Sequence, residues 1–292
     1  MVHIYEKTCK TKENSYGLIE LDDAETFKKG PCIITIIAGP VSKKSINGSL
    51  RQTAHLINPD IDIKYDKDRR LLGLGFGDYK EKTERFTRID PNEEELKTFM
   101  IKYLYPLIEE NSNKIDVLRA MKNVRNLNFV TYCNGAKVFV KIEKSLEQRM
   151  IELGYKKLEI ALILSQITLA AVSGVVIKKK GTKSLAITFG DVLDEEFEKN
   201  PNIFLDNPNI KDRGYIDYNN SLGFGIVEDG EHSFKKHMTE NPILKEKIQT
   251  FINTSLDNSI YNYYSDKMIE PITFEKIESA FNDLEYKNKR GR

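Results

Sequence analysis

The sequence predicts an α/β protein in which a mostly parallel central sheet is flanked by helices. Two observations predict this class. Short apolar runs that are typical of strands alternate with longer segments whose apolar residues recur at steps of three and four, as in amphipathic helices. The run CIITII, residues 32–37, is apolar at nearly every position, as a strand covered on both faces requires. Strands alternating with helices form βαβ units, which build a parallel sheet.

The chain is long enough, at 292 residues, to bury one large core. It contains no internal repeat and no linker rich in Pro, Gly or Ser. We predict a single domain over residues 1–255. A C-terminal extension, residues 256–292, is expected to hold a short helix and a basic tail.

Charge and cysteine content exclude several classes of protein. Lys and Arg number 45 against 44 Asp and Glu, so the net charge of +1 gives no reason to expect a nucleic-acid partner. The three cysteines, Cys9, Cys32 and Cys133, are odd in number and widely spaced, which predicts neither a disulfide framework nor a metal site. We expect no cofactor and a cytoplasmic location. We also expect no membrane span, because polar residues interrupt the apolar stretch 160–177. The sequence does not indicate an oligomeric state.

The predicted elements follow one another in a regular order. Two alternating segments, residues 3–9 and 16–21, flank a polar stretch and predict an opening β-hairpin. Further strands are predicted at residues 32–37, 71–76, 127–132, 158–164, 184–189 and 223–227. Helices are predicted at residues 45–57, 90–111 and 135–153, with residues 114–124 extending or following the second of them.

Local signals refine three of these elements. Asp90 is the predicted N-cap of the second helix, with Pro91 at its first position. The segment GLGFG, residues 73–77, lacks the spacing of a phosphate-binding loop and predicts a strand with close backbone packing. About 20 residues separate the predicted strands that end near Leu164 and begin near Ser184, so no large lid is expected.

Three polar residues follow the ends of predicted strands, where open α/β sheets bind their ligands. They are Cys133, Asp191 and His232, in that chain order. Asp194 competes with Asp191 but is also a suitable N-cap for the acidic segment that follows it. His237 is the rival of His232.

The chain resembles the α/β-hydrolase superfamily in two features. Its candidate residues follow the chain order nucleophile, acid, histidine. Its segment TYCNG, from Thr131 to Gly135, resembles the family's G-x-nucleophile-x-G turn. Thr131 stands where the family has its first glycine. A cysteine at the nucleophile position is similar to the dienelactone hydrolases. The resemblance spans nearly the whole chain, and it implies the family's fold and an acyl-transfer activity.

The resemblance also implies a role for each candidate. Cys133 would be the nucleophile, His232 the general base and Asp191 the residue that orients His232. The oxyanion hole would use the backbone N–H of Asn134 and a second N–H from the segment after residue 37. Pro40 has no N–H, which leaves Gly39 or Val41 as the second donor.

These assignments predict a hydrolase or acyltransferase that acts on an ester or thioester of a small or acyl-bearing substrate, through an acyl-enzyme intermediate. The alternative is a binding or interaction protein on the same scaffold, in which Cys133 is a buried and inert thiol.

Overall fold

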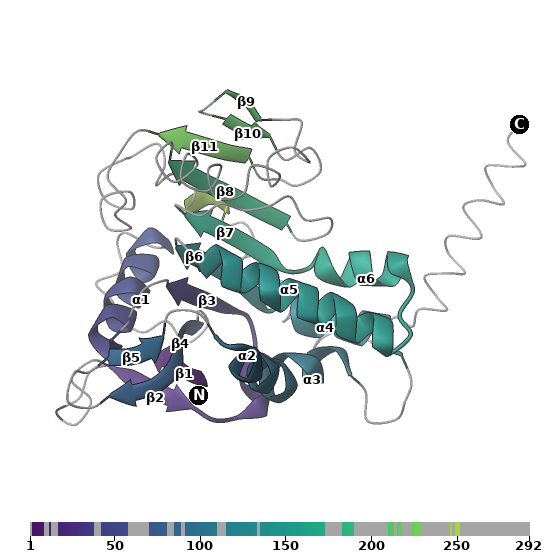
Figure 1. Cartoon of the computed structure of the whole chain (residues 1–292), viewed down its shortest axis with the longest axis horizontal. Helices are drawn as coiled ribbons and strands as arrows, with labels where there is room; N and C mark the ends of the chain where they lie inside the picture. Colours follow the sequence, from purple (N-terminus) through teal and green to yellow (C-terminus); the bar gives the residue numbers. More distant parts are fainter. Residues whose placement is uncertain are drawn as a thin grey trace, which may run out of the picture.

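The computed structural model describes the following residues: 2–8, 12, 17–37, 42–57, 70–80, 85–88, 91–109, 115–132, 135–172, 183–189, 210–212, 215–217, 224–228, 246 and 249–251. These residues form both strands and helices (Figure 1). The α/β class predicted from the sequence is confirmed.

The strands of this part of the chain form one sheet. Their bounds are β1 (Val2–Lys7), β2 (Leu18–Leu21), β3 (Cys32–Ile37), β4 (Arg70–Lys80), β5 (Arg85–Arg88), β6 (Leu127–Tyr132), β7 (Thr168–Val172), β8 (Lys183–Phe189), β9 (Ile210–Asp212), β10 (Tyr215–Asp217) and β11 (Phe224–Glu228). Among the described residues the order is β2-β1-β4-β3-β6-β7-β8-β11-β10-β9, and β5 pairs with β4.

The sheet is mixed rather than mostly parallel. Each neighbouring pair from β4 to β11, in the order β4-β3-β6-β7-β8-β11, is parallel. The pairs outside this centre, β1 with β2 and β4 on one side and β10 with β11 and β9 on the other, are antiparallel. The parallel centre therefore sends the carboxyl ends of six strands to one edge of the sheet.

Helices lie on both faces of the sheet around β3 (Figure 1). Their bounds are α1 (Lys43–Ile57), α2 (Glu93–Phe99), α3 (Tyr105–Ile108), α4 (Val117–Val124), α5 (Gly135–Glu152) and α6 (Lys157–Leu164), with a 3-10 turn η1 (Ala24–Phe27) and a π-helical turn η3 (Met100–Leu104).

Helix α1 packs closely on one face of β3 and β4. The hydroxyls of Thr35 on β3 and Thr53 on α1 lie 3.5 Å apart. A Cβ added to Gly73 on β4 would lie 2.6 Å from the Cγ2 atom of Ile46, so only a glycine lets α1 approach this closely. The close backbone packing predicted for residues 73–77 is confirmed at this position.

The larger hydrophobic core lies on the opposite face, under α2 to α6. Alternate residues of β3 and β6 point into it, since successive side chains of a strand face opposite sides. Phe129 of β6 packs edge-to-face on Phe139 of α5, with ring centroids 4.9 Å apart. Phe27 packs in the same manner on Tyr103, at 6.1 Å.

The predicted strand at residues 158–164 is wrong, because this segment is helix α6 and the strand is β7. The run KLEIALIL is apolar at most positions, and a short apolar run does not distinguish a strand from a buried helix. The Glu159 carboxylate accepts the backbone N–H of Lys156 at 2.7 Å, which caps the helix. The β7–β8 connection is therefore residues 173–182, outside the described residues, and the absence of a large lid stays a prediction.

The predicted start of the second helix is also wrong by two residues. The N-cap of α2 is Asn92, whose Oδ1 accepts the backbone N–H of Glu95 at 2.8 Å. The Glu95 carboxylate in turn accepts the backbone N–H of Asn92 at 3.1 Å, which completes a capping box. Asp90 lies outside the described residues. None of the described helices is long and apolar enough to cross a membrane.

Candidate active site at the carboxyl edge of the sheet

The connection between β6 and α5 is short. Strand β6 ends at Tyr132 and α5 begins at Gly135, so only two residues join them. These two residues, Cys133 and Asn134, lie outside the described residues. A Cβ added to Gly135 would lie 2.3 Å from the carbonyl oxygen of Ile36 on β3. The first residue of α5 must therefore be a glycine, because the backbone of β3 occupies the space.

Strands β3 and β6 bring two predicted segments to the same edge. They pair in parallel, with Thr35 opposite Val130 and Ile37 opposite Tyr132. The ends of β3 and β6 therefore lie side by side, and they precede the predicted second oxyanion donor and the predicted nucleophile, respectively.

The remaining predicted site residues lie outside the described part of the chain: Gly39, Val41, Asp191, Asp194, His232 and His237. The strands that precede the acid and the histidine are described. Strand β8 ends at Phe189 and β11 ends at Glu228, and both are parallel to β6. The topology thus sends the chain toward the same edge before Asp191 and before His232.

Thr131 is an unusual residue beside this turn. It is completely buried, and its hydroxyl has no hydrogen-bond partner in the described part of the chain. Buried hydroxyls are normally paired, because an unpaired one loses its bonds to water without replacement. The strand that precedes the β6–α5 connection therefore carries a buried hydroxyl within the core that is unpaired among the described residues.

Cys32, the one cysteine among the described residues, has the properties of an inert thiol. It starts β3 at the amino edge of the sheet, opposite the predicted site, and it is completely buried. Burial raises the pKa of the Cys32 thiol to about 12. Its Sγ lies 3.5 Å from the carbonyl oxygen of Asn126, to which it donates. The thiolate, which is the nucleophilic form, is therefore absent near neutral pH.

A buried polar network holds the amino edge together. The Nδ2 of Asn128 donates to the carbonyl oxygen of Cys32 at 3.2 Å, and its Oδ1 accepts the hydroxyl of Thr168 at 2.8 Å. These bonds join β3, β6 and β7. Because the amide group is satisfied on both sides, the network has a structural role rather than a ligand-binding one.

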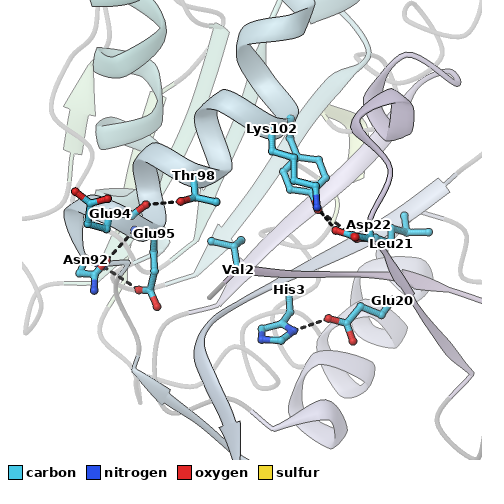
Figure 2. A pocket seen from close by; sticks show the side chains of 11 residues that line it. Val2, His3, Glu20, Leu21, Asp22, Asn92, Glu94, Glu95, Thr98 and Lys102 are labelled. Atoms are coloured by element: carbon cyan, nitrogen blue, oxygen red, sulfur yellow. Dashed lines mark hydrogen bonds and ion pairs between the residues drawn. The ribbon is translucent and has the colours of Figure 1, made fainter.

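A pocket of about 770 Å³ opens at the carboxyl edge, beside β1 and the start of α2 (Figure 2). Its walls come from three separate segments, so no local motif marks it in the sequence. The lining residues are Val2, His3, Glu20, Leu21, Asp22, Asn92, Glu94, Glu95, Thr98, Lys102 and Tyr103. Strands β4 and β3 lie between β1 and β6, which separates the pocket from the β6 turn by three strand spacings, on the order of 14 Å.

Four of the side chains that line this pocket form two pairs. Glu20 contacts the Nδ1 of His3, and Lys102 forms an ion pair with Asp22 (Figure 2). The Glu95 carboxylate is part of the α2 capping box. Across the described residues, no group of three His, Cys, Asp or Glu side chains is arranged to hold a metal ion.

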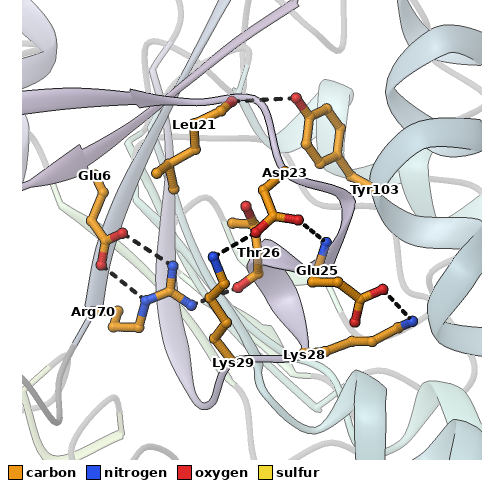
Figure 3. Close-up of polar contacts among 9 residues, drawn as sticks. All are labelled: Glu6, Leu21, Asp23, Glu25, Thr26, Lys28, Lys29, Arg70 and Tyr103. Atoms are coloured by element: carbon orange, nitrogen blue, oxygen red, sulfur yellow. Dashed lines mark hydrogen bonds and ion pairs between the residues drawn. The ribbon is translucent and has the colours of Figure 1, made fainter.

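A second charged cluster lies at the amino end of β4 (Figure 3). The Arg70 guanidinium donates to both carboxylate oxygens of Glu6, at 2.9 and 3.1 Å, and to the carbonyl oxygen of Thr26 at 2.5 Å. Both charged side chains are nearly buried, with 10% and 13% of their surface exposed. This bidentate pair joins β1, β4 and η1, three elements that are distant in the sequence.

Comparisons with known proteins do not assign the chain to a family. No protein-family model matches it, and no curated protein matches it.

Proposed function

We propose that the chain is an α/β-hydrolase-type enzyme that cleaves or transfers the acyl group of an ester or thioester. The observation that carries the proposal is the β6–α5 connection. A central parallel strand followed by a two-residue turn and a helix is the context in which such enzymes hold their nucleophile. Cys133 is one of the two residues in that turn.

The close approach of Gly135 to β3 supports the same proposal. The carbonyl of Ile36 lies against the first residue of α5, so the segments after β3 and β6 start next to each other. In this fold the oxyanion hole takes one backbone N–H from each of these two segments. Asn134 and either Gly39 or Val41 are the proposed donors.

In the proposed reaction, His232 takes the proton of the Cys133 thiol, and the thiolate attacks the carbonyl carbon. A C–S bond forms, the bond from that carbon to the leaving group breaks, and His232 gives its proton to the leaving group. His232 then takes a proton from water, whose hydroxide adds to the acyl carbon. The C–S bond breaks, the acid leaves, and the proton held by His232 returns to Cys133. Asp191 orients the imidazole throughout.

The second candidate is a catalytically inactive binding protein on the same scaffold. Thr131 favours it, because it is a fully buried threonine at the position where active α/β-hydrolases use a small residue. In that case Cys133 would be an unreactive thiol, like Cys32.

Cysteine labelling separates the two candidates. The native protein is treated with limiting iodoacetamide over a range of pH, and the modified residues are mapped by mass spectrometry. We expect rapid labelling of Cys133 below about pH 7, because a neighbouring imidazolium lowers the pKa of a thiol. This labelling should be lost in His232→Ala. Cys32 should stay unlabelled, because burial protects it and raises its pKa to about 12.

Matched variants test the individual assignments. His237→Ala should leave the labelling of Cys133 unchanged, and Asp191→Asn should slow it more than Asp194→Asn does. Hydrolysis of p-nitrophenyl esters and of thioesters should disappear in Cys133→Ala. If Cys133 reacts no faster than a free thiol, or only after denaturation, the catalytic proposal is overturned in favour of the binding protein.

A further inference from the structure

Helix α6 carries apolar residues on all its sides but is buried on only one. Ile160, Ile163 and Leu164 belong to the core. Leu158 and Leu162, one turn apart on the opposite side, have 71% and 39% of their surface exposed. A helix that is apolar all round is normally covered on every side, so the outer side of α6 lacks a covering element in the described structure.

The exposed apolar residues gather around this helix. Six large apolar side chains are exposed in the described part of the chain, and four of them lie on α6 or on the segments beside it. Besides Leu158 and Leu162, they are Ile151 in the last turn of α5 and Ile115 just before α4. A Cβ on Gly154 would lie 3.6 Å from Ile115, which puts Ile115 beside the α5–α6 connection. We call these four residues the α6 face.

A complementary apolar stripe occurs in the C-terminal extension. The sequence TFEKIESAFNDLEY, residues 273–286, lies outside the described residues. Its large apolar residues Phe274, Ile277, Phe281 and Leu284 are separated by three, four and three positions, the spacing of one face of a helix. An isolated helix of this length is marginal in water, so the stripe requires a surface to cover.

We propose that residues 273–286 form an amphipathic helix that packs on the α6 face of the same chain. The chain that connects the described residues to the stripe is long enough for this contact. About 22 residues connect Phe251, the last described residue, to the stripe, and they can span on the order of 70 Å. Four acidic residues and one lysine, Lys276, stand among the apolar residues of the stripe, and the exposed Lys156 and Lys157 at the start of α6 supply cations that can pair with these acids. The acidic residues are Glu275, Glu278, Asp283 and Glu285.

Hydrogen exchange of the full-length protein tests this contact. We expect the amides of residues 273–286 to exchange at least about tenfold more slowly than in an unstructured chain, because packing supplies most of the stability of such a helix. The double substitution Leu158→Gln and Leu162→Gln should remove this protection. The matched control, Ile19→Gln with Ile101→Gln, changes two exposed isoleucines that do not belong to the α6 face, and it should leave the protection of residues 273–286 intact.

The reciprocal variant, Phe274→Gln with Phe281→Gln, should speed exchange in α6 while exchange in the buried strands β3 and β6 stays unchanged, which shows that the core is still folded. Absence of protection in the unmodified protein overturns the proposal. Protection that survives the change of Leu158 and Leu162 overturns it as well, since the extension then packs elsewhere. If the protection depends on protein concentration and light scattering detects a dimer, the α6 face is covered by a second copy of the chain. That result also overturns the proposal.

Discussion

Gly135 carries a hydrogen atom where every other residue has a Cβ atom, and the geometry of the candidate site depends on this difference. Its Cα lies so close to β3 that an added methyl carbon would be 2.3 Å from the Ile36 carbonyl oxygen and 3.0 Å from the carbonyl carbon. Both atoms belong to the backbone, which cannot rotate away as a side chain does. Any larger residue must therefore move the start of α5 away from the sheet, together with the turn that contains Cys133.

We predict that Gly135→Ala destabilises the protein by about 1–3 kcal/mol, the usual range for a group forced into a filled core. The matched control is Gly48→Ala within α1, where an added Cβ meets nothing within 4 Å. That change should stabilise the protein by about 0.5–1 kcal/mol, because alanine is the better helix former. Urea denaturation of both variants measures the difference. Equal stability of Gly135→Ala and the unmodified protein would contradict the close contact.

At the scale of the element, the ends of α2 and α6 depend on side chains that reach back to the backbone. Both helices use a glutamate at the third position to accept the N–H of the capping residue. In α2 the Asn92 amide completes the box, whereas the sequence pattern predicted Asp90, two residues earlier, as the cap. Short polar residues before a helix are interchangeable in sequence, and the backbone conformation of Asn92 selects it.

Substituting Asn92 and Asp90 in turn tests which of the two residues caps α2. We predict that Asn92→Ala lowers the free energy of unfolding by about 1 kcal/mol, since the backbone N–H of Glu95 loses its partner. Asp90→Ala is the comparison, and its effect should be within about 0.5 kcal/mol. Thermal denaturation followed by circular dichroism provides both values. A larger loss for Asp90→Ala than for Asn92→Ala would refute the assignment of the cap.

At the scale of the whole molecule, a nearly buried charge pair links two strands that are far apart in the sequence. Glu6 and Arg70 are 64 residues apart, and their bidentate contact attaches β1 to the first residue of β4. The third bond of the guanidinium, to the carbonyl of Thr26, includes η1 in the same cluster (Figure 3). The pair therefore adds to the backbone pairing of β1 with β4 and connects it to η1.

We predict that Glu6→Gln costs about 3–5 kcal/mol of stability, because it leaves the Arg70 charge buried without its carboxylate. The double variant Glu6→Gln with Arg70→Met should lose less than the single one, since it removes the stranded charge as well. The control is Glu25→Gln, which breaks the exposed ion pair with Lys28 and should change stability by less than about 0.5 kcal/mol. A cost for Glu6→Gln no larger than that of the control would count against the buried pair.

The sequence by itself determined the α/β class, the bounds of β3 and the place of the β6–α5 turn, because these features depend on local apolar periodicity and on the position of a glycine. Local pattern could not decide whether residues 158–164 form a strand or a helix, since a short apolar run suits both. Tertiary structure decided that, as well as the mixed sheet order, the cap of α2, and the contacts of Gly135 with Ile36 and of Glu6 with Arg70. The physical reason is that these contacts join residues far apart in the chain, and only the packing of the whole sheet brings them together.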